Sequence, residues 1–255
     1  MFFITGSEGM IGSYIMPVIK ETGEYYATYD IKNKLDIMDV DRLTNLMSSY
    51  PFKIVVHLAA YPHPGIDITD EEYMRVNVQG TKNVLYAMER SNCNKIIFMS
   101  SGGVYGFSNG TCEPKALPLT EDSPVTLKPT IYDKTKIICE EILKFNADFN
   151  SVVFRVEKPA NDITNRLLKQ TQMFAAVSLE NMQRLFSLAV EYLLNGGKTT
   201  ILNMGNKELV GNESSKVPDN IIEWAKENYP DAEINLENKN SPLYSVQKAI
   251  DVLGY

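Results

Sequence analysis

The stretch Gly6-Ser7-Glu8-Gly9-Met10-Ile11-Gly12 decides the fold, because it joins a short apolar segment, residues 2–5, to a segment with helical spacing, residues 10–20. Glycines allow a tight turn and let backbone N–H groups approach an anion, and the helix that follows directs its positive end at the same point. Gly12 permits close packing of the helix on the strand. The motif therefore predicts a strand, a phosphate-binding turn and a helix.

Apolar segments and segments with helical spacing alternate from this turn up to residue 155. Strands are expected at residues 2–5, 25–29, 54–59, 95–99 and 151–155, and helices at residues 10–20, 39–49, 71–90 and 132–145. Residues 54–59 form a continuous apolar run, as buried parallel strands do. The alternation predicts an α/β fold with a doubly wound parallel sheet, covered by helices on both faces.

Residues 156–255 are less regular. Helices are expected at residues 179–194, 217–228 and 242–253 and a strand at residues 199–203, whereas residues 156–177 give no clear prediction. We expect residues 1–155 to form a Rossmann domain that binds a dinucleotide. Residues 156–255 are expected to complete the sheet and to add a small substrate-binding portion.

An acidic residue ends the second predicted strand. Asp30 lies 18 residues after Gly12, at the position where a carboxylate can accept hydrogen bonds from both hydroxyls of the adenosine ribose. A carboxylate there also repels a 2′-phosphate, so Asp30 favours NAD over NADP as the cofactor. Lys32 lies nearby, and its ammonium could tolerate a 2′-phosphate. Lys32 therefore argues against the preference for NAD that Asp30 indicates.

Tyr132 and Lys136 are four residues apart in a segment with helical spacing, so both side chains can lie on one face of the helix. A free tyrosine is a poor base at neutral pH, but a nearby ammonium favours the phenolate. Ser101 follows the predicted strand at residues 95–99 and is the candidate donor that holds a substrate oxygen. This set indicates an enzyme that moves a hydride to or from the cofactor while Tyr132 moves a proton.

The composition argues against several classes of partner. A net charge of −7 without a basic stripe argues against nucleic acid. Cys93, Cys112 and Cys139 have no C-x-x-C spacing and are expected to be reduced thiols, and no cluster of residues has the spacing of a metal site. No apolar run reaches the roughly 18 residues that a membrane span needs. We expect a cytoplasmic protein with no metal and no membrane partner.

The chain resembles the NAD-dependent epimerase/dehydratase family of the extended short-chain dehydrogenases, which act on sugars and nucleotide sugars. The matching segments, in order, are residues 6–12, Tyr29-Asp30, Asp36-Ile37-Met38-Asp39, His57-Leu58-Ala59-Ala60, Asn77-Val78-Gln79-Gly80-Thr81, Ser100-Ser101-Gly102-Gly103-Val104-Tyr105-Gly106, Tyr132-x-x-x-Lys136, Phe154-Arg155 and Asn203-Met204-Gly205. The resemblance extends over nearly the whole chain and is strongest up to residue 155.

The resemblance implies a role for each matching position. Asp36 and Ile37 would contact the adenine, Leu58–Ala60 would form the wall beneath the dinucleotide, and Asn77 would have a structural role near the active site. His57 is expected to be a structural residue inside its strand. The cofactor-binding set implied in this way is Gly6, Gly9, Met10, Ile11, Gly12, Asp30, Asp36, Ile37, Leu58, Ala59, Ala60, Asn77, Ser100, Tyr132 and Lys136.

The same resemblance assigns the chemistry. Tyr132 matches the catalytic base, Lys136 the lysine that also holds the nicotinamide ribose, and Ser101 the residue that holds the substrate oxygen. Dehydratases of the family carry an acidic pair where this chain has Gly102 and Gly103, which argues against dehydration. The family also forms homodimers through the helices expected here at residues 71–90 and 132–145, so a homodimer is expected.

The substrate is predicted less sharply. The family usually continues the strand after Arg155 with N-x-Y-G-P, but this chain has Val156-Glu157-Lys158-Pro159-Ala160. The candidate substrate-binding residues are Ser101, Gly102, His63 and Arg166. A nucleotide-sugar epimerase of the UDP-hexose type is the leading hypothesis. The alternatives are a dehydrogenase of free sugars or uronates, in which Arg166 could hold a carboxylate, and an NAD-binding regulatory protein without catalysis.

Overall fold

The computed structural model describes residues 1–62, 68–108, 110–157, 159, 176–209 and 218–255. Among these residues, one sheet has the strand order β2-β1-β3-β4-β6-β7, and the pairs β1–β2, β1–β3 and β3–β4 are parallel. The order reverses between β1 and β3, and open α/β sheets bind ligands beside such a switch point. The strands are β1 (Phe2–Thr5), β2 (Tyr26–Tyr29), β3 (Ile54–His57), β4 (Lys95–Ser101), β6 (Asn150–Val156) and β7 (Thr200–Met204).

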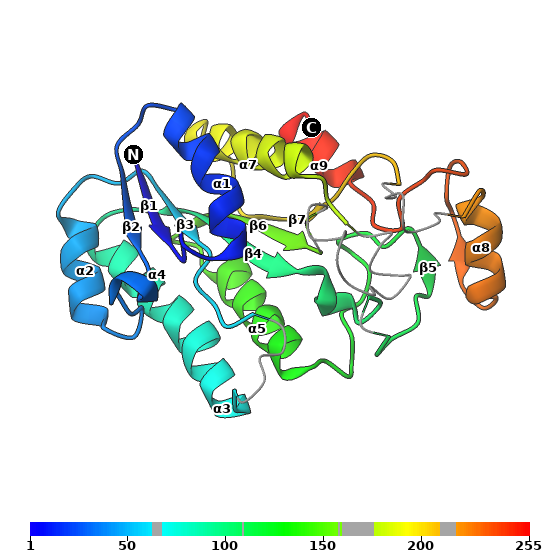
Figure 1. Ribbon diagram of the computed structural model, residues 1–255, viewed down its shortest axis with the longest axis horizontal. Helices are drawn as coiled ribbons and strands as arrows, with labels where there is room; N and C mark the ends of the chain where they lie inside the picture. Colours follow the sequence, from blue (N-terminus) through cyan, green and yellow to red (C-terminus); the bar gives the residue numbers. More distant parts are fainter. Residues whose placement is uncertain (63–67, 109, 158, 160–175, 210–217) are drawn as a thin grey trace. The chain divides into compact units, whose positions relative to one another are not determined.

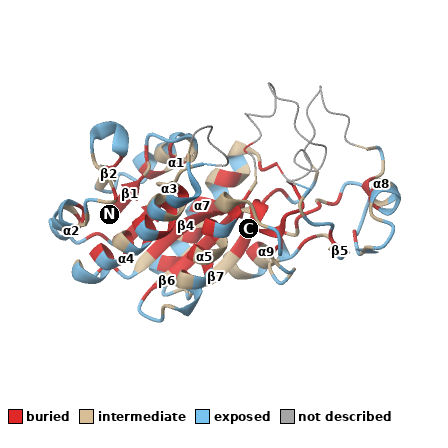
Figure 2. Ribbon diagram, turned by 90° about the horizontal axis from the view of Figure 1, so that it is seen from below, coloured by how far each residue is buried: buried red, intermediate tan, exposed pale blue. Residues whose placement is uncertain are grey.

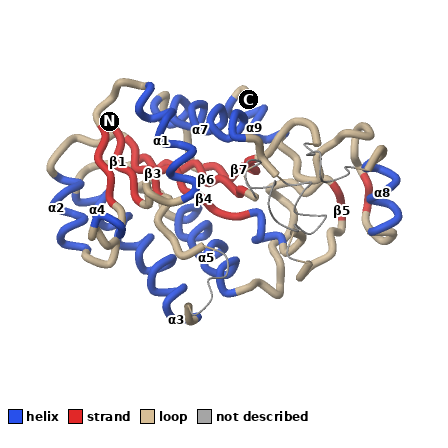
Figure 3. The backbone as a smooth tube through the Cα atoms, viewed as in Figure 1, coloured by secondary structure: helices blue, strands red, loops and turns tan. Residues whose placement is uncertain are grey.

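Helices flank this sheet, as the alternating pattern predicted. In Figure 1, α1 covers one face of the sheet, and α4 and α5 lie against the other face. The tube in Figure 3 shows the same layers, with the strands in red between helices in blue. The helices are α1 (Met10–Glu21), α2 (Val40–Ser48), α3 (Asp70–Tyr73), α4 (Gly80–Arg90), α5 (Ile131–Phe145), α7 (Leu179–Leu194), α8 (Ile221–Asn228) and α9 (Gln247–Leu253).

The core of the sheet is built from strands that are apolar on both faces. Every residue of β1 and of β3 is buried, whereas β2, at the edge, is half-buried over most of its length. Figure 2 shows the sheet strands mainly in the colour of buried residues and the outer sides of the helices mainly in that of exposed ones. A parallel sheet covered on both sides requires such strands, because neither face meets water.

One predicted helix is interrupted. The segment predicted as a helix over residues 71–90 consists of α3, a π-helical segment at Met74–Gln79, and α4. Asn77 lies inside the π-helical segment, and its side chain bonds residues of two other segments. π-Helical turns occur mostly as local insertions at functional sites. The period of the apolar residues did not predict this insertion, because the side-chain contacts that accompany it come from distant parts of the chain.

Several predicted ends were wrong. β3 ends at His57 rather than at residue 59, α8 begins at Ile221 after the Asn220 cap, and α9 begins at Gln247. A second, two-stranded sheet pairs β5 (Ala116–Leu117) with β8 (Glu233–Ile234) and was not predicted. A strand of two residues is too short to show an alternating pattern.

The described chain forms two compact units. The first consists of Met1–Ser100, Thr130–Val153 and Phe186–Thr200, and the second of Ser101–Pro129, Phe154–Leu185 and Ile201–Tyr255, within the described residues. Both units draw on three separate segments, so the chain passes between them repeatedly. The predicted division at residue 155 concerns where cofactor and substrate bind, and it stays a prediction.

Candidate cofactor and catalytic site

The glycine turn has the close backbone approach that its sequence predicted. Gly6 has a φ of +70°, and a Cβ atom at this position would lie 2.5 Å from the backbone nitrogen of Ala59. A Cβ atom at Gly12 would lie 2.6 Å from the carbonyl carbon of Ser7. Both positions therefore require glycine, since the clashing atoms belong to the backbone and cannot rotate away.

The turn fits an anionic group. α1 begins at Met10; its N-cap residue, Gly9, offers no side-chain hydrogen bond, and its first turn has no acidic residue. Ser7, in the middle of the turn, is buried, and its hydroxyl has no hydrogen-bond partner among the described residues. Helix N-termini with open N–H groups bind phosphate, and a buried hydroxyl is normally hydrogen-bonded. Ser7 was not among the predicted site residues, although its place inside the glycine motif could have indicated it.

The carboxylate of Asp30 is held in one orientation beside this turn. Its two oxygens accept hydrogen bonds from the backbone N–H groups of Glu8, at 2.8 Å, and Lys32, at 2.9 Å. The ammonium group of Lys32 donates to the backbone carbonyl of Glu8 at 2.6 Å. Lys32 is thus engaged with the same turn that Asp30 supports. The carboxylate keeps acceptor capacity for ribose hydroxyls, because each oxygen has two lone pairs.

The predicted adenine and wall residues lie in the same unit. The Asp36 side chain accepts from the backbone N–H of Met38 at 2.9 Å, and the buried Ile37 side chain fills the space over Gly80. The backbone N–H groups of Leu58 and Ala59 donate to the Thr5 hydroxyl at 3.3 Å, which holds the segment after β3 against the end of β1. That these residues, and with them Met10, Ile11 and Ala60, contact the cofactor stays a prediction.

Asn77 ties three segments together. Its amide oxygen accepts from the backbone N–H of Tyr61 at 2.7 Å, and its amide nitrogen donates to the Thr135 hydroxyl at 3.0 Å. Asn77 is buried, and all of these partners are in the first unit. It therefore fixes the loop after β3 to helix α5, the helix that carries Tyr132 and Lys136. This geometry agrees with a structural role near the site.

Tyr132 and Lys136 lie on one face of α5, as their spacing predicted. The Lys136 ammonium is 5.6 Å from the centroid of the Tyr132 ring and donates to the Met99 carbonyl at 2.7 Å. Lys136 is buried, and burial lowers its pKa to about 8. A buried ammonium next to a phenol supplies the charge that favours the phenolate.

Asp133 and Thr130 define the start of α5. Asp133, which follows Tyr132, forms a capping box with Thr130. The Asp133 carboxylate accepts from the backbone N–H and the hydroxyl of Thr130, and the Thr130 hydroxyl oxygen accepts from the backbone N–H of Asp133. Its carboxylate therefore stabilises the first turn of the helix. The pattern Thr-x-x-Asp ahead of an apolar run could have predicted this.

Glu140 is a buried residue that the sequence analysis missed. It lies one turn after Lys136 on α5, and the Ser100 hydroxyl donates to its carboxylate. Ser100, predicted to contact the cofactor, is therefore bonded to the helix that carries Tyr132 and Lys136, the predicted catalytic pair. The negative charge of Glu140 raises the pKa of Lys136 and opposes part of the effect of burial. The signal was an acid four residues after a lysine in an otherwise apolar helical face.

Ser101 belongs to the second unit. It ends β4, and its hydroxyl accepts the backbone N–H of Gly103 at 3.0 Å, which begins the short helix Gly102–Tyr105. Tyr132 and Lys136 belong to the first unit, so the predicted cooperation of Ser101 with them stays a prediction. His63 and Arg166, the other candidate substrate-binding residues, lie outside the described residues.

His57 is held by two hydroxyl groups in the core of the first unit. Its Nδ1 lies 2.7 Å from the Thr5 hydroxyl and its Nε2 lies 3.0 Å from the Thr81 hydroxyl. Burial, and to a lesser extent the charge of Lys136, lowers the pKa of His57 to about 3. The structure therefore holds a neutral imidazole, which agrees with the structural role predicted.

This lowered pKa predicts a pH-dependent stability. The unfolded chain binds a proton at His57 below about pH 6.5, whereas the folded state does not until about pH 3. The contribution of the neutral His57 to the free energy of unfolding is thus complete above pH 6.5. It is lost as the pH falls below this value, by up to about 1.4 kcal/mol per pH unit. We expect the His57→Gln variant to lose this part of the slope in urea unfolding between pH 7 and pH 4.5. An unchanged slope would show that His57 titrates normally in the folded protein.

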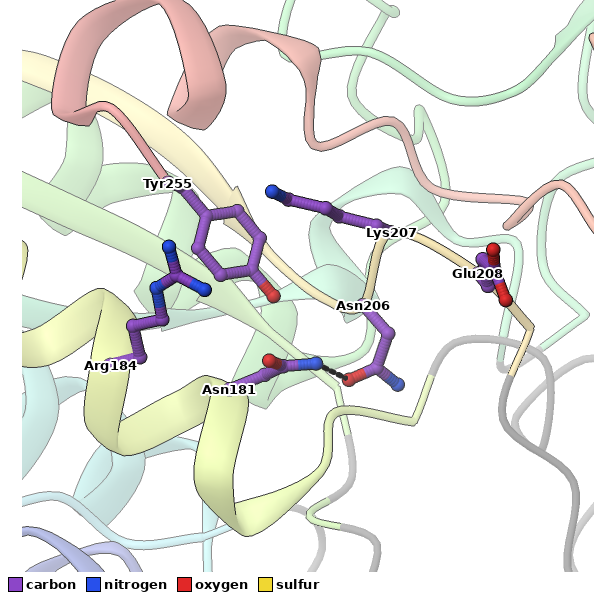
Figure 4. Close-up of a pocket in the computed structure, with 6 residues that line it drawn as sticks. All are labelled: Asn181, Arg184, Asn206, Lys207, Glu208 and Tyr255. Atoms are coloured by element: carbon purple, nitrogen blue, oxygen red, sulfur yellow. Dashed lines mark hydrogen bonds between the residues drawn. The ribbon is translucent and has the colours of Figure 1, made fainter.

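A pocket of about 240 Å³ in the second unit contains none of the predicted site residues. Figure 4 shows Arg184 and Lys207 on either side of the Tyr255 ring, whose centroid lies 5.6 Å from the guanidinium carbon and 4.9 Å from the ammonium. The Tyr255 hydroxyl donates to the Gly205 carbonyl at 3.1 Å. The residues that line the pocket are Asn181, Arg184, Asn206, Lys207, Glu208 and Tyr255.

Residues 2–161 match the model of the NAD dependent epimerase/dehydratase family. The chain belongs to this family. The resemblance drawn from the motifs is thereby confirmed, and the predicted cofactor is confirmed at the level of the family, which is NAD-dependent. Residues 2–161 include the glycine turn, Asp30, Ser101, Tyr132 and Lys136, so these candidate residues fall within the matched region.

Individual relatives carry more specific names. The chain is 33% identical over 132 residues to UDP-glucose 4-epimerase 2 of Oryza sativa subsp. japonica, covering 50% of this chain and 31% of that protein. It is 30% identical over 163 residues to the UDP-glucose 4-epimerase of Yersinia enterocolitica, covering 55% of this chain and 47% of that protein. The match thus spans less than half the length of these curated relatives.

Comparison with a solved structure confirms the fold of this chain. The UDP-glucose 4-epimerase from Brucella ovis in complex with NAD superposes with a TM-score of 0.73 at 20% sequence identity, covering 100% of this chain and 92% of that chain. The doubly wound α/β fold predicted from the sequence is therefore correct.

Among the described residues, no group of three or more His, Cys, Asp or Glu side chains is placed to hold a metal ion. In the part of the chain that the structure describes, no helix is long and apolar enough to cross a membrane.

Proposed function

We propose that this chain is an NAD-dependent nucleotide-sugar epimerase of the UDP-hexose type. The observation that carries the proposal is the Tyr132–Lys136 pair on α5, with a buried ammonium 5.6 Å from the Tyr132 ring, in the same unit as the glycine turn. The curated relatives named UDP-glucose 4-epimerase support the choice of substrate class.

In this proposal the chain supplies binding and proton transfer. Backbone N–H groups of the glycine turn and the Ser7 hydroxyl hold the pyrophosphate, and Asp30 accepts the ribose hydroxyls. Bound NAD supplies the acceptor for a hydride from a sugar carbon and its return to that carbon. Tyr132 takes the proton of the sugar hydroxyl and later gives it back. Lys136 stabilises the phenolate form of Tyr132, and Ser101 holds the substrate oxygen.

The test is an assay of the purified, NAD-loaded protein with UDP-glucose and UDP-galactose, followed both by NADH absorbance and by separation of the two epimers. We expect interconversion of the epimers without a net increase in NADH. Accumulation of NADH with a free aldose or uronate would instead establish the dehydrogenase alternative. NAD binding without any turnover would establish the regulatory alternative.

The proposed assembly is a homodimer whose interface is formed by the segment from α3 to α4 and by α5. Tyr86 on α4 and Phe145 at the end of α5 are large apolar residues that are exposed in the single chain. Exposed aromatic side chains on these two helices are consistent with an interface there. Monomeric mass in solution at micromolar concentration would contradict this proposal.

A further inference from the structure

Glu157 lies against the residue that follows Ser101. It comes directly after β6, and a Cβ atom at Gly102 would lie 2.6 Å from Glu157 Cγ and closer still to the carboxylate oxygen Oε1. The two residues are 55 positions apart in the sequence but belong to the same unit. The carboxylate of Glu157 therefore occupies the space that any side chain at position 102 would fill.

A buried tyrosine holds this carboxylate. The Tyr244 hydroxyl donates to Glu157 Oε1 at 3.1 Å. Tyr244 itself is fixed, because its ring packs at 5.7 Å from the Tyr105 ring and at 6.0 Å from the Phe107 ring. Burial, and then the neighbouring negative charge of Glu157, raises the pKa of Tyr244 well above its usual value, so Tyr244 remains a hydrogen-bond donor. Glu157 is only half-buried, which leaves part of its surface exposed.

The chemistry of this group limits what can lie beside Ser101. An ionised carboxylate only accepts hydrogen bonds, and its bonds to hydroxyl donors are short and strong. A second carboxylate within several ångströms is repelled, the more so where water is partly excluded. A sugar hydroxyl next to the reacting carbon is thus a favourable neighbour for Glu157, and a sugar carboxylate is an unfavourable one.

Resting on the proposed function, we infer that Glu157 is a specificity-determining residue that selects neutral sugars over carboxylated ones. Its carboxylate, held by Tyr244 over Gly102, accepts a hydrogen bond from a hydroxyl of the substrate sugar. The absence of a side chain at Gly102 makes this possible, because any larger residue would displace the carboxylate. The class of substrate is therefore a nucleotide sugar with an uncharged hexosyl or pentosyl group rather than a uronosyl group.

The test compares UDP-glucose with UDP-glucuronate, which differ in the charge of the sugar. Affinities of the NAD-loaded protein for both are measured by calorimetry, together with turnover of each. We expect the unmodified protein to prefer UDP-glucose by about tenfold or more, and Glu157→Gln, which keeps the shape and removes the charge, to lose most of this preference. Gly102→Ala should also reduce the preference for UDP-glucose over UDP-glucuronate, because its Cβ displaces the Glu157 carboxylate.

The control is Glu237→Gln, which removes an exposed glutamate of the same unit and should keep the preference of the unmodified protein. Turnover of UDP-glucose with an unchanged preference in Glu157→Gln would overturn the inference and leave the proposed function standing. A preference in binding that depends on Glu157, without turnover of any nucleotide sugar, would overturn the proposed epimerase and support the binding role of Glu157. Failure of the unmodified protein to bind either nucleotide sugar would overturn both.

Discussion

Replacing Tyr132 by phenylalanine is expected to lower the rate of epimer interconversion by about 10³-fold, because the substrate hydroxyl would lose the group that exchanges its proton. The ring and its contact with Lys136 would remain, since the ammonium lies 5.6 Å from the ring centroid and bonds the Met99 carbonyl rather than the phenol. NAD affinity should therefore change by less than about threefold, or about 0.6 kcal/mol. The measurements are kcat with UDP-glucose and NAD affinity by fluorescence titration.

A matched control is Tyr50, which follows α2 in the same unit. Tyr50 is exposed, and its ring centroid lies 4.6 Å from that of Tyr25, so Tyr50→Phe removes a hydroxyl from a surface aromatic. This variant should keep the kcat of the unmodified protein. If Tyr132→Phe also kept kcat within tenfold, Tyr132 would not be the proton-transfer residue and the assignment of α5 as the catalytic helix would fail.

Motifs and residue spacing within one segment predicted those parts of the fold that depend on interactions within that segment. The glycine turn was predictable from its motif, because the backbone geometry of such a turn leaves no room for a side chain at Gly6 and Gly12. Helix α5 was predicted because its apolar residues repeat at helical spacing, whereas its capping box was found only in the structure. Tyr132 and Lys136 lie on one helix, so their relative placement follows from spacing alone.

Contacts between distant segments were not predictable in this way. The partnership of Glu157 with Gly102 depends on a segment 55 residues away, and the sequence analysis treated Glu157 only as a departure from the family pattern. The π-helical segment at Met74–Gln79 coincides with bonds from Asn77 to Tyr61 and Thr135, which belong to other elements. Such features depend on tertiary packing, which a single sequence does not display through its periodicity.

Ser7 and Glu140 lie in segments whose secondary structure was predicted, but their burial was not predicted. Both were inside segments that the sequence analysis had assigned, yet their importance comes from burial: Ser7 has no hydrogen-bond partner among the described residues and Glu140 accepts from Ser100. A polar group that is buried is informative because leaving it unsatisfied costs free energy. Burial of single polar residues within a predicted turn or helix cannot be inferred from residue type alone.

Replacing Gly6 by alanine is expected to remove measurable NAD binding and to destabilise the fold by about 3 kcal/mol or more. The φ of +70° costs an alanine about 1–2 kcal/mol by itself, and the new Cβ would lie 2.5 Å from the backbone nitrogen of Ala59. Relief of this clash requires movement of the turn or of the segment after β3, and both are proposed to contact the dinucleotide. For a chain of this size the loss corresponds to a fall in Tm of roughly 6–12 °C.

Gly23→Ala separates backbone strain from the loss of close approach. Gly23 has a φ of +66°, close to that of Gly6, but nothing lies within 4 Å of a Cβ atom placed there. This control should lose only about 1–2 kcal/mol of stability and should bind NAD as the unmodified protein does. Thermal unfolding with and without NAD measures both effects, because a ligand that binds only the folded state raises Tm. If Gly6→Ala kept the NAD-dependent rise in Tm of the unmodified protein, the turn at Gly6 would not be the pyrophosphate site, and the cofactor would have to bind elsewhere on the sheet.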